Sequence, residues 1–518
     1  MEALSKKIRR LASLTIAGVL MVSVGACGSS SGGSGSTQGV AQDLVVARSL
    51  ETTDMLPETA YSNGDIWAVQ QVFESLTKNK ADASGVEPSL ATKWTKASDG
   101  LSWTFELRKG VKFHNGETMT ADDVKWSLDF ARTERADKPW QFLFTKIKSV
   151  DIVNQYAVRI NLTEKWAPLP SDMAIFACAI MPKNFAGMTE EQFRNNPIGT
   201  GPYKFSSWTK GDSIKFTNFK DYWDKSTPKL NSVTFKYVPD ANTRSQMVQS
   251  GQAHVDEFPT AASVSTLKNV STVDVKSFPS TSLIWINLNN RKEPLNDVHV
   301  RRAMAYAIDK KAITKAVYYG TAEVANTMLS KNLMGYASDI KNVYSIDKAK
   351  KEMKESSSPN GFTVTIQVQS GDPEKSQLAQ ILQNSWKKIG ITVKLQTLDS
   401  TTIYSNRKSG DFEIAMFEMT NDISDPDEWM HYMFASTAAV NSGYSSKKVD
   451  QLIDEAASND DAATRKKLYK EVQQILAEDV PEIPLVYKPG LFVVRKGVEN
   501  FKVTTLGQYD LTKTTITK

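Results

Sequence analysis

One segment reads as strand, helix and strand in succession, and it constrains the fold more than any other part of the sequence. Residues 362–368 have the pattern of a strand, residues 374–389 place apolar side chains at helical spacing, and residues 391–398 form a second strand. Gly390 separates the helix from the second strand, as the end of a helix favours. A unit of this kind is a βαβ crossover and places two parallel strands in one sheet. The sequence therefore predicts an α/β fold.

Other elements repeat this alternation along the chain. Thr120 and Asp123 have the spacing of a capping box and predict the start of a helix. Strands are predicted at 44–47, 101–107 and 411–419, and helices at 66–76, 449–455 and 463–478. A chain of 518 residues exceeds one ordinary domain, so we expect two or three lobes.

The first residues have the composition of a secretory leader. Basic residues precede an uncharged run at 11–26 that is shorter than a membrane span. Val24-Gly25-Ala26-Cys27 resembles a lipobox, which predicts a signal peptide over 1–26 and lipidation of Cys27. The Gly/Ser-rich stretch that follows predicts a flexible tether, so residues 27–42 are expected to link the lipid to the folded body.

Charge and cysteine content exclude several classes of protein. Residues 1–26 hold four Lys or Arg and one Glu, so their removal lowers the formal charge from +5 to +2. No basic stripe suited to nucleic acid remains. With Cys27 lipidated, Cys178 is the only other cysteine and lies in an apolar run, so we expect a buried thiol and no intramolecular disulfide.

Local catalytic and metal-binding motifs are absent from the sequence. The four histidines are not spaced as metal ligands, and neither a nucleophile elbow, a zinc-protease motif nor a phosphate-binding loop occurs. We therefore expect a protein that is not an enzyme and that needs no metal or cofactor.

A series of motifs resembles the family-5 extracellular solute-binding proteins of ABC importers. They are 73–76, 88–94, 99–108, 110–116, 120–124, 198–203, 239–251, 287–290 and 294–309. The resemblance covers most of the body. It implies a periplasmic-binding-protein fold of the class II or cluster C type, with two main lobes around a cleft and an extra third lobe.

Lobe limits follow from this resemblance. Lobe I is expected to consist of 43–77, 196–281 and 490–518, lobe II of 78–195, and lobe III of 282–489. Crossing segments near 281 and 489 would form a hinge, which allows the lobes to close on a ligand.

The resemblance also locates a ligand site. In peptide-binding members an aspartate before an acidic-Pro turn pairs with the α-ammonium of the peptide, and Asp422 holds that position. A carboxylate in a closed cleft needs a cation, and an ammonium provides one with three donors. Met419, Thr420 and Asn421 precede it and are expected to offer backbone groups to an added peptide strand. A cap of the turn before Pro426 is the competing interpretation for Asp422, and Asp425 suits a ligand contact and a turn cap equally well.

Three further residues are expected at the site. Trp285 is a candidate wall for a side-chain pocket, and Asp54 and Tyr61 lie on the loop after the first strand. For Trp285, core packing is the competing interpretation.

The predicted function is capture of short peptides by a lipid-anchored receptor on the extracytoplasmic face of a bacterial plasma membrane. The expected partners are the permease and ATPase subunits of an ABC importer, and the receptor is expected to be a monomer. A metal chelate of the nickel type or an oligosaccharide remains an alternative ligand, since relatives bind each and the chain has 11 Trp.

Overall fold

The predicted crossover is present, with both strands in one sheet. The computed structural model describes residues 40–135, 138–438 and 442–517. In it, β15 (Phe362–Gln369) and β16 (Ile391–Leu398) pair in parallel, and α10 (Pro373–Lys387) connects them. Asp372 caps α10 by accepting the backbone N–H of Lys375 at 2.8 Å. Gly390 takes a φ of 86°, a left-handed conformation that glycine adopts without strain.

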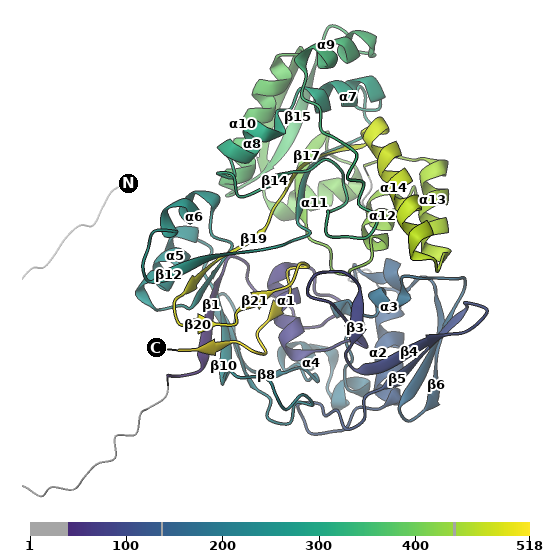
Figure 1. Ribbon diagram of the computed structural model, residues 1–518, viewed down its shortest axis with the longest axis vertical. Coiled ribbons are helices and arrows are strands. Elements are labelled where there is room, and N and C mark those ends of the chain that lie inside the picture. Colours follow the sequence, from purple (N-terminus) through teal and green to yellow (C-terminus); the bar gives the residue numbers. More distant parts are fainter. Residues whose placement is uncertain (1–39, 136–137, 439–441, 518) are drawn as a thin grey trace, which may run out of the picture. The chain divides into compact units, whose positions relative to one another are not determined.

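These two strands belong to a six-stranded sheet, drawn in the upper part of Figure 1. Its order is β14 (Glu323–Val324), β18 (Glu482–Tyr487), β13 (Leu283–Leu288), β17 (Ile414–Met419), β15 and β16. The helices of this region are α7 (Val298–Tyr306), α8 (Lys310–Ala316), α9 (Ile346–Glu355), α11 (Ser400–Ser409), α12 (Asp427–Phe434), α13 (Lys447–Ser458) and α14 (Ala462–Asp479). Separate apolar clusters cover its two faces: Ile286 and Trp386 pack in one, Trp285 and Trp429 in the other.

A seven-stranded sheet draws its strands from three distant parts of the chain. Its order is β12 (Val273–Phe278), β19 (Gly490–Arg495), β11 (Val255–Glu257), β1 (Asp43–Arg48), β10 (Ser232–Tyr237), β9 (Ser213–Asn218) and β8 (Tyr203–Thr209). Central β1 pairs in parallel with β10 and β11. The helices before or between these strands are α1 (Asn63–Val72), α5 (Ala241–Ser250) and α6 (Ala261–Leu267). All of these strands lie within the three ranges expected for lobe I.

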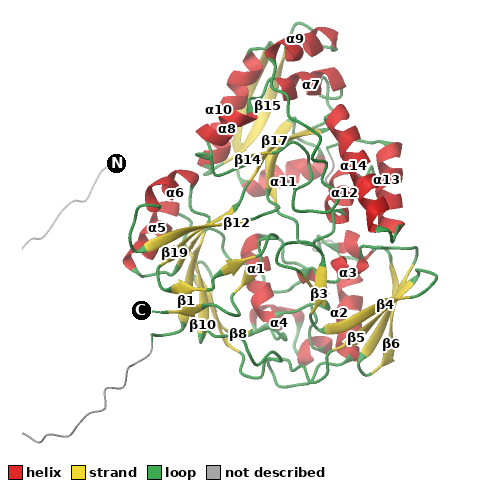
Figure 2. Cartoon of the chain, viewed as in Figure 1, coloured by secondary structure: helices red, strands yellow, loops and turns green. Residues whose placement is uncertain are grey.

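A four-stranded antiparallel sheet forms a third region, whose yellow strands are clear in Figure 2. Its order is β4 (Ala91–Lys96), β5 (Ser102–Leu107), β7 (Ala157–Leu162) and β6 (Ile147–Asn154). The predicted capping box begins α2 (Ala121–Arg132), where the N–H of Thr120 donates to Asp123 at 2.8 Å. The same region contains α3 (Leu169–Asp172), α4 (Glu190–Asn195) and the 3₁₀ turns Gln141–Phe144, Phe176–Cys178 and Lys183–Gly187.

The remaining strands form short pairs. They are β2 (Thr77–Asn79) with β3 (Val86–Pro88), β20 (Val498–Glu499) with β23 (Thr515–Ile516), and β21 (Lys502–Val503) with β22 (Tyr509–Asp510). Most predicted elements are confirmed, but the helix expected over 66–76 ends at Val72, because Phe73 is already extended. Cys178 is buried, as expected.

The chain passes between the two large sheets twice. It leaves β12 for β13 across residues 279–282, and it leaves β18 for β19 across 488–489. The backbone N–H of Lys488 donates to the carbonyl of Ser282 at 3.0 Å, so the two crossings lie side by side.

Candidate functional site

The loop between β17 and α12 is the centre of the candidate site. Met419 is the last residue of β17 and pairs with Leu283 of β13. Beyond the strand, the N–H of Asn421 donates to Thr281 Oγ1 at 3.1 Å, on one of the crossings between the large sheets. The end of β17 is thus fixed to a crossing segment.

A buried acid holds the next turn of the loop. Glu428, on α12, is 1% exposed, and its Oε2 accepts the N–H groups of Asp422 at 3.1 Å and Ile423 at 3.2 Å. Burial raises the pKa of Glu428 well above its ordinary value, and the neighbouring Asp422 raises it further. Two carboxyl groups therefore lie together at the loop.

Asp422 is partly buried, and its carboxylate has no hydrogen-bond or ion-pair partner in the part of the chain that the structure describes. Its own backbone carbonyl accepts Asn79 Nδ2 at 3.0 Å. Burial raises the pKa of Asp422 to about 7. This carboxylate is therefore desolvated without a protein cation, which is the state that a ligand cation would stabilise.

Asp425, three residues further on, already binds other groups of the protein. Its two oxygens accept Arg465 Nη1 at 2.7 Å and Nη2 at 2.8 Å, and Oδ1 also accepts the N–H of Asp427 at 3.0 Å. The turn-cap interpretation therefore fits Asp425 better than a ligand contact.

Trp285 lies in the core next to the site rather than on an open surface. It is 1% exposed and packs on Trp429, with ring centroids 5.4 Å apart, and on Phe417 at 5.9 Å. Phe417 is partly exposed and separates Trp285 from the end of β17. In this structure Trp285 is thus a buried core residue next to the site and does not form the wall of an open pocket.

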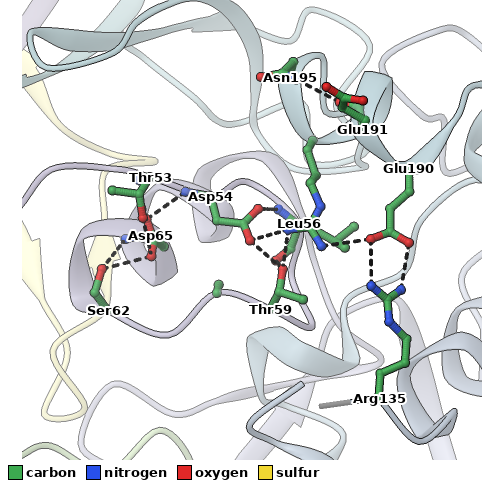
Figure 3. A network of polar contacts seen from close by, with 12 residues as sticks. Thr53, Asp54, Leu56, Thr59, Ser62, Asp65, Arg135, Glu190, Glu191 and Asn195 are labelled. Atoms are coloured by element: carbon green, nitrogen blue, oxygen red, sulfur yellow. Dashed lines mark hydrogen bonds and ion pairs between the residues drawn. The ribbon is translucent and has the colours of Figure 1, made fainter. Parts of the chain in front are cut away.

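Asp54 takes part in a network of polar contacts with other protein residues (Figure 3). Its Oδ2 accepts the hydroxyl of Thr59 at 2.6 Å and pairs with Arg194, which also contacts Glu190 at 2.8 Å. Glu190 in turn binds Arg135, whose hydrogen bonds lower the pKa of Glu190 to about 2. The carboxylate of Asp54 therefore binds side chains of the protein itself.

Tyr61 is 48% exposed, and its ring lies 5.1 Å from that of Tyr404 on α11. It therefore joins the loop after β1 to the helix before β17. The structure places Met419 at the end of β17 and Thr420, Asn421 and Asp422 in the loop that follows, with Trp285 in the adjacent core. Asp54 lies outside this group.

Sequence reasoning missed Glu428, Asn79 and Arg407. The first two bind the backbone of the 421–424 loop, and Arg407 lies against the rings of Phe417 and Trp285. No local motif marks Asn79 or Arg407, since their partners are distant in the sequence. Glu428 follows Pro426 at the start of a helix, and this is the only local signal it offers.

One group of side chains has the spacing of metal ligands. His299, Glu352 and Glu355 bring ligand atoms within 4.8 Å of one another, although sequence spacing had predicted no metal site. His299 Nδ1 is bonded to Glu352 at 2.8 Å, and the group is partly exposed and far along the chain from Asp422. None of the helices in 40–135, 138–438 or 442–517 combines the length and apolar character of a bilayer span.

Comparison with known proteins gives a consistent family. The chain is 29% identical to the dipeptide-binding protein of Escherichia coli K12 over 474 residues, covering 85% of this chain and 88% of that protein. Among solved structures, a periplasmic binding protein of Helicobacter pylori in complex with the peptide STSA superposes with a TM-score of 0.83 at 28% identity, covering 92% and 98%. A Campylobacter jejuni protein in complex with Ni(L-His) gives 0.78 at 26% identity, covering 90% and 97%.

The family resemblance seen in the sequence motifs is confirmed, as is the periplasmic-binding-protein fold. Members of this family bind solutes and are not enzymes. The matching family model, over residues 85–441, is that of the bacterial extracellular solute-binding proteins, family 5, and the chain belongs to this family.

Proposed function

We propose that this protein captures short peptides for an ABC importer, holding the peptide α-ammonium at Asp422. The observation that carries the proposal is the carboxylate of Asp422, which is partly buried and has no protein partner among the described residues. An ammonium would neutralise it and supply three donors. A second carboxyl group, that of Glu428, lies at the same place and accepts the backbone N–H of Asp422.

Backbone groups support a peptide rather than an isolated amine. Met419, Thr420 and Asn421 continue β17 toward Asp422, and an extended peptide can pair with such a segment as an added strand. Main-chain hydrogen bonds would give affinity with little dependence on the peptide side chains. The names of the Escherichia coli and Helicobacter pylori relatives point to the same ligand class.

Closure around the peptide would involve the three lobes expected from the sequence. These are lobe I (43–77, 196–281 and 490–518), lobe II (78–195) and lobe III (282–489). The paired crossings at 279–282 and 488–489 would act as the hinge. The monomeric receptor would be anchored through lipidated Cys27, which lies outside the described residues together with the predicted signal peptide. Delivery to a permease and its ATPase would follow closure.

Calorimetric titration tests the α-ammonium contact. The Asp422→Asn variant should bind a free-amino tripeptide more weakly than the wild type, by roughly two orders of magnitude or more, because loss of one partner of a buried pair costs ~3–5 kcal/mol. For the N-acetylated tripeptide, which lacks the cation, the variant and the wild type should differ far less.

Asp274→Asn is the matched control, since Asp274 is an exposed residue of β12. It removes one carboxylate and should leave both titrations unchanged. Equal losses for the free and acetylated peptides would remove Asp422 from the site. Tight binding of a nickel chelate or an oligosaccharide, with no peptide binding, would show that the ligand is not a peptide and belongs to one of these classes.

A further inference from the structure

The region of the four-stranded sheet contacts the helices that follow the site loop at several points. The backbone N–H of Ala167, in the loop before α3, donates to the carbonyl of Ala457 on α13 at 2.7 Å. The ring centroids of Phe142 and of Tyr432, on α12, lie 5.4 Å apart. These contacts join the range expected for lobe II to that expected for lobe III, and they do so along α12 and α13.

Trp166 lies at the centre of this contact. The residue is 8% exposed, and its ring centroid is 5.4 Å from that of His431 on α12. The indole is held from its own side, because Nε1 donates to Asp172 Oδ2 at 2.6 Å. Asp172 is itself fully buried, at the end of α3. Trp166 is therefore a fixed side chain that packs against a helix of the other region.

His431 presents a positive charge to this indole. Its Nδ1 is bonded to Asp427 Oδ1 at 2.9 Å and its Nε2 to Asp454 Oδ1 at 3.2 Å. Burial lowers the pKa of His431, but the two carboxylates outweigh burial and raise it to about 10. The imidazole is therefore charged at neutral pH. A cation within about 6 Å of an indole ring is attracted to the ring, most strongly where water is excluded.

Helix α12 connects this contact to the candidate ligand site. Glu428, in its first turn, accepts the N–H groups of Asp422 and Ile423, and His431 follows one turn later on the same helix. Trp429 and Met430, between them, are at most 1% exposed. Because the helix is anchored in the core, the loop that carries Asp422 and the imidazolium of His431 must move together.

The two sides of the contact belong to different packed bodies. Val46 of β1 and Phe105 of β5 are members of one apolar cluster, so the regions of the seven-stranded and four-stranded sheets share a core. Trp429 of α12 belongs to another cluster. Rotation of the upper region about the paired crossings at 279–282 and 488–489 would therefore separate His431 from Trp166.

We propose that Trp166 and His431 form a lock that holds the receptor closed and slows release of the bound peptide. The inference rests on the proposed function and gives the range expected for lobe II a role in ligand retention. The lock forms only after the peptide has entered the open cleft, so it acts on the dissociation rate and leaves the association rate largely unchanged.

The test measures both rates with a radiolabelled free-amino tripeptide at neutral pH, dissociation being followed after addition of excess unlabelled tripeptide. Trp166→Leu should release the peptide about tenfold faster than the wild type, with an association rate within about twofold. Trp166→Phe keeps an aromatic face and should recover part of the retention. His431→Gln removes the cation and should also accelerate release, while the double variant Trp166→Leu/His431→Gln should be no faster than Trp166→Leu alone.

Trp126→Leu is the matched control, because Trp126 packs on Phe130 and Phe185 within its own region, and it should release the peptide at the wild-type rate. Circular dichroism checks the fold of each variant, and His431→Gln carries the test if Trp166→Leu does not fold. Wild-type release from the folded variants, or independent effects in the double variant, would overturn the lock, while loss of affinity in Asp422→Asn would still uphold the proposed function. Failure of the wild type to bind the tripeptide would overturn both.

Discussion

Asn79 and Asp422 are joined by a hydrogen bond across 343 positions of sequence, with Asn79 Nδ2 donating to the Asp422 carbonyl at 3.0 Å. The Oδ1 of the same side chain accepts the N–H of Ser424, also at 3.0 Å. The side-chain amide of Asn79 therefore binds the loop at two points, and this loop carries the Asp422 carboxylate that is the candidate ligand contact. Asn79 lies in the range expected for lobe II and Asp422 in that expected for lobe III, so we propose that this contact helps to hold these two lobes together when they close.

Asn79→Ala should weaken peptide binding about tenfold, because each lost hydrogen bond contributes roughly 0.5–1.5 kcal/mol to closure. Calorimetric titration measures the affinity, and small-angle scattering should show a larger radius of gyration for the unliganded variant than for the wild type. Asn115→Ala is the control, since Asn115 is exposed and bonds only within its own turn. Unchanged affinity and radius in Asn79→Ala would show that the contact does not contribute to closure.

Peptide binding should depend on pH through Asp422, whose pKa burial raises to about 7. The ammonium needs the ionised carboxylate, so affinity should fall about tenfold per pH unit below 7. It should fall again above about 8, where a peptide amine loses its proton. A titration series from pH 5 to about 9 should thus give a maximum near 7–8, and Asp422→Asn should lose the acidic limb. An acidic limb retained in the variant would assign it to another group, of which Glu428 is the nearest.

The Asp422 carboxyl should also make the stability of the unliganded protein depend on pH. Its ionisation favours peptide binding but disfavours the folded state. A folded-state pKa above the unfolded value favours the folded state at low pH, and this contribution is lost as pH rises from about 4 through about 7. Glu58 and Glu74, with pKa values raised by burial to about 8 and about 7, have the same sign. Only the difference between wild type and Asp422→Asn therefore isolates Asp422. Chemical denaturation should show the variant gaining stability relative to wild type as pH rises through 7.

Membrane attachment is expected to depend on Cys27. Cys27→Ser should move the protein from the membrane fraction to the soluble fraction, because stable anchoring requires the acyl chains that modify this thiol. Fractionation after a high-salt wash measures the change, and Cys178→Ser is the matched control, since Cys178 is buried in the body. Membrane retention of Cys27→Ser would contradict the predicted lipoprotein.

Secondary-structure elements that depend only on neighbouring residues were predicted well. The crossover at residues 362–398 follows from hydrophobic periodicity and a single glycine. The ligand role of Asp422 stays a prediction, and it could be made from the sequence because its motif is local. Contacts between distant segments could not be predicted in this way. Asn79 and Arg407 acquire their roles from partners that only the folded chain brings to them. Whether Trp285 faces a pocket or the core depends likewise on Phe417 and Trp429, which cover it.

Asp54 illustrates a second limit of sequence reasoning. It was expected at the ligand site because it follows the first strand, and a carboxylate in a loop is equally suited to a ligand or to a protein cation. The choice is made by Arg194, a residue of α4, which pairs with Asp54 in the folded chain. The pairing of Asp54 with Arg194 across 140 positions therefore has no counterpart in any local motif.

The buried ion pair between Asp425 and Arg465 should determine the stability of the site loop. Arg465 binds both oxygens of Asp425, at 2.7 and 2.8 Å, and also donates to the carbonyl of Ala456 at 2.8 Å. Arg465→Met removes the cation and leaves Asp425 buried beside Asp427, so the free energy of unfolding should fall by about 3–5 kcal/mol. Lys331→Met breaks an exposed pair with Glu323 and should cost less than about 1 kcal/mol.

A double variant separates the pair from the individual side chains. Arg465→Met combined with Asp425→Asn no longer buries an unpaired carboxylate, and the asparagine can still accept the N–H of Asp427, as Asp425 does at 3.0 Å. The double variant should therefore be more stable than Arg465→Met alone, and denaturation at neutral pH should yield a coupling energy of about 1–3 kcal/mol. Additive losses would mean that Asp425 and Arg465 stabilise the loop independently, and Asp425 would then again be a candidate for contact with the ligand.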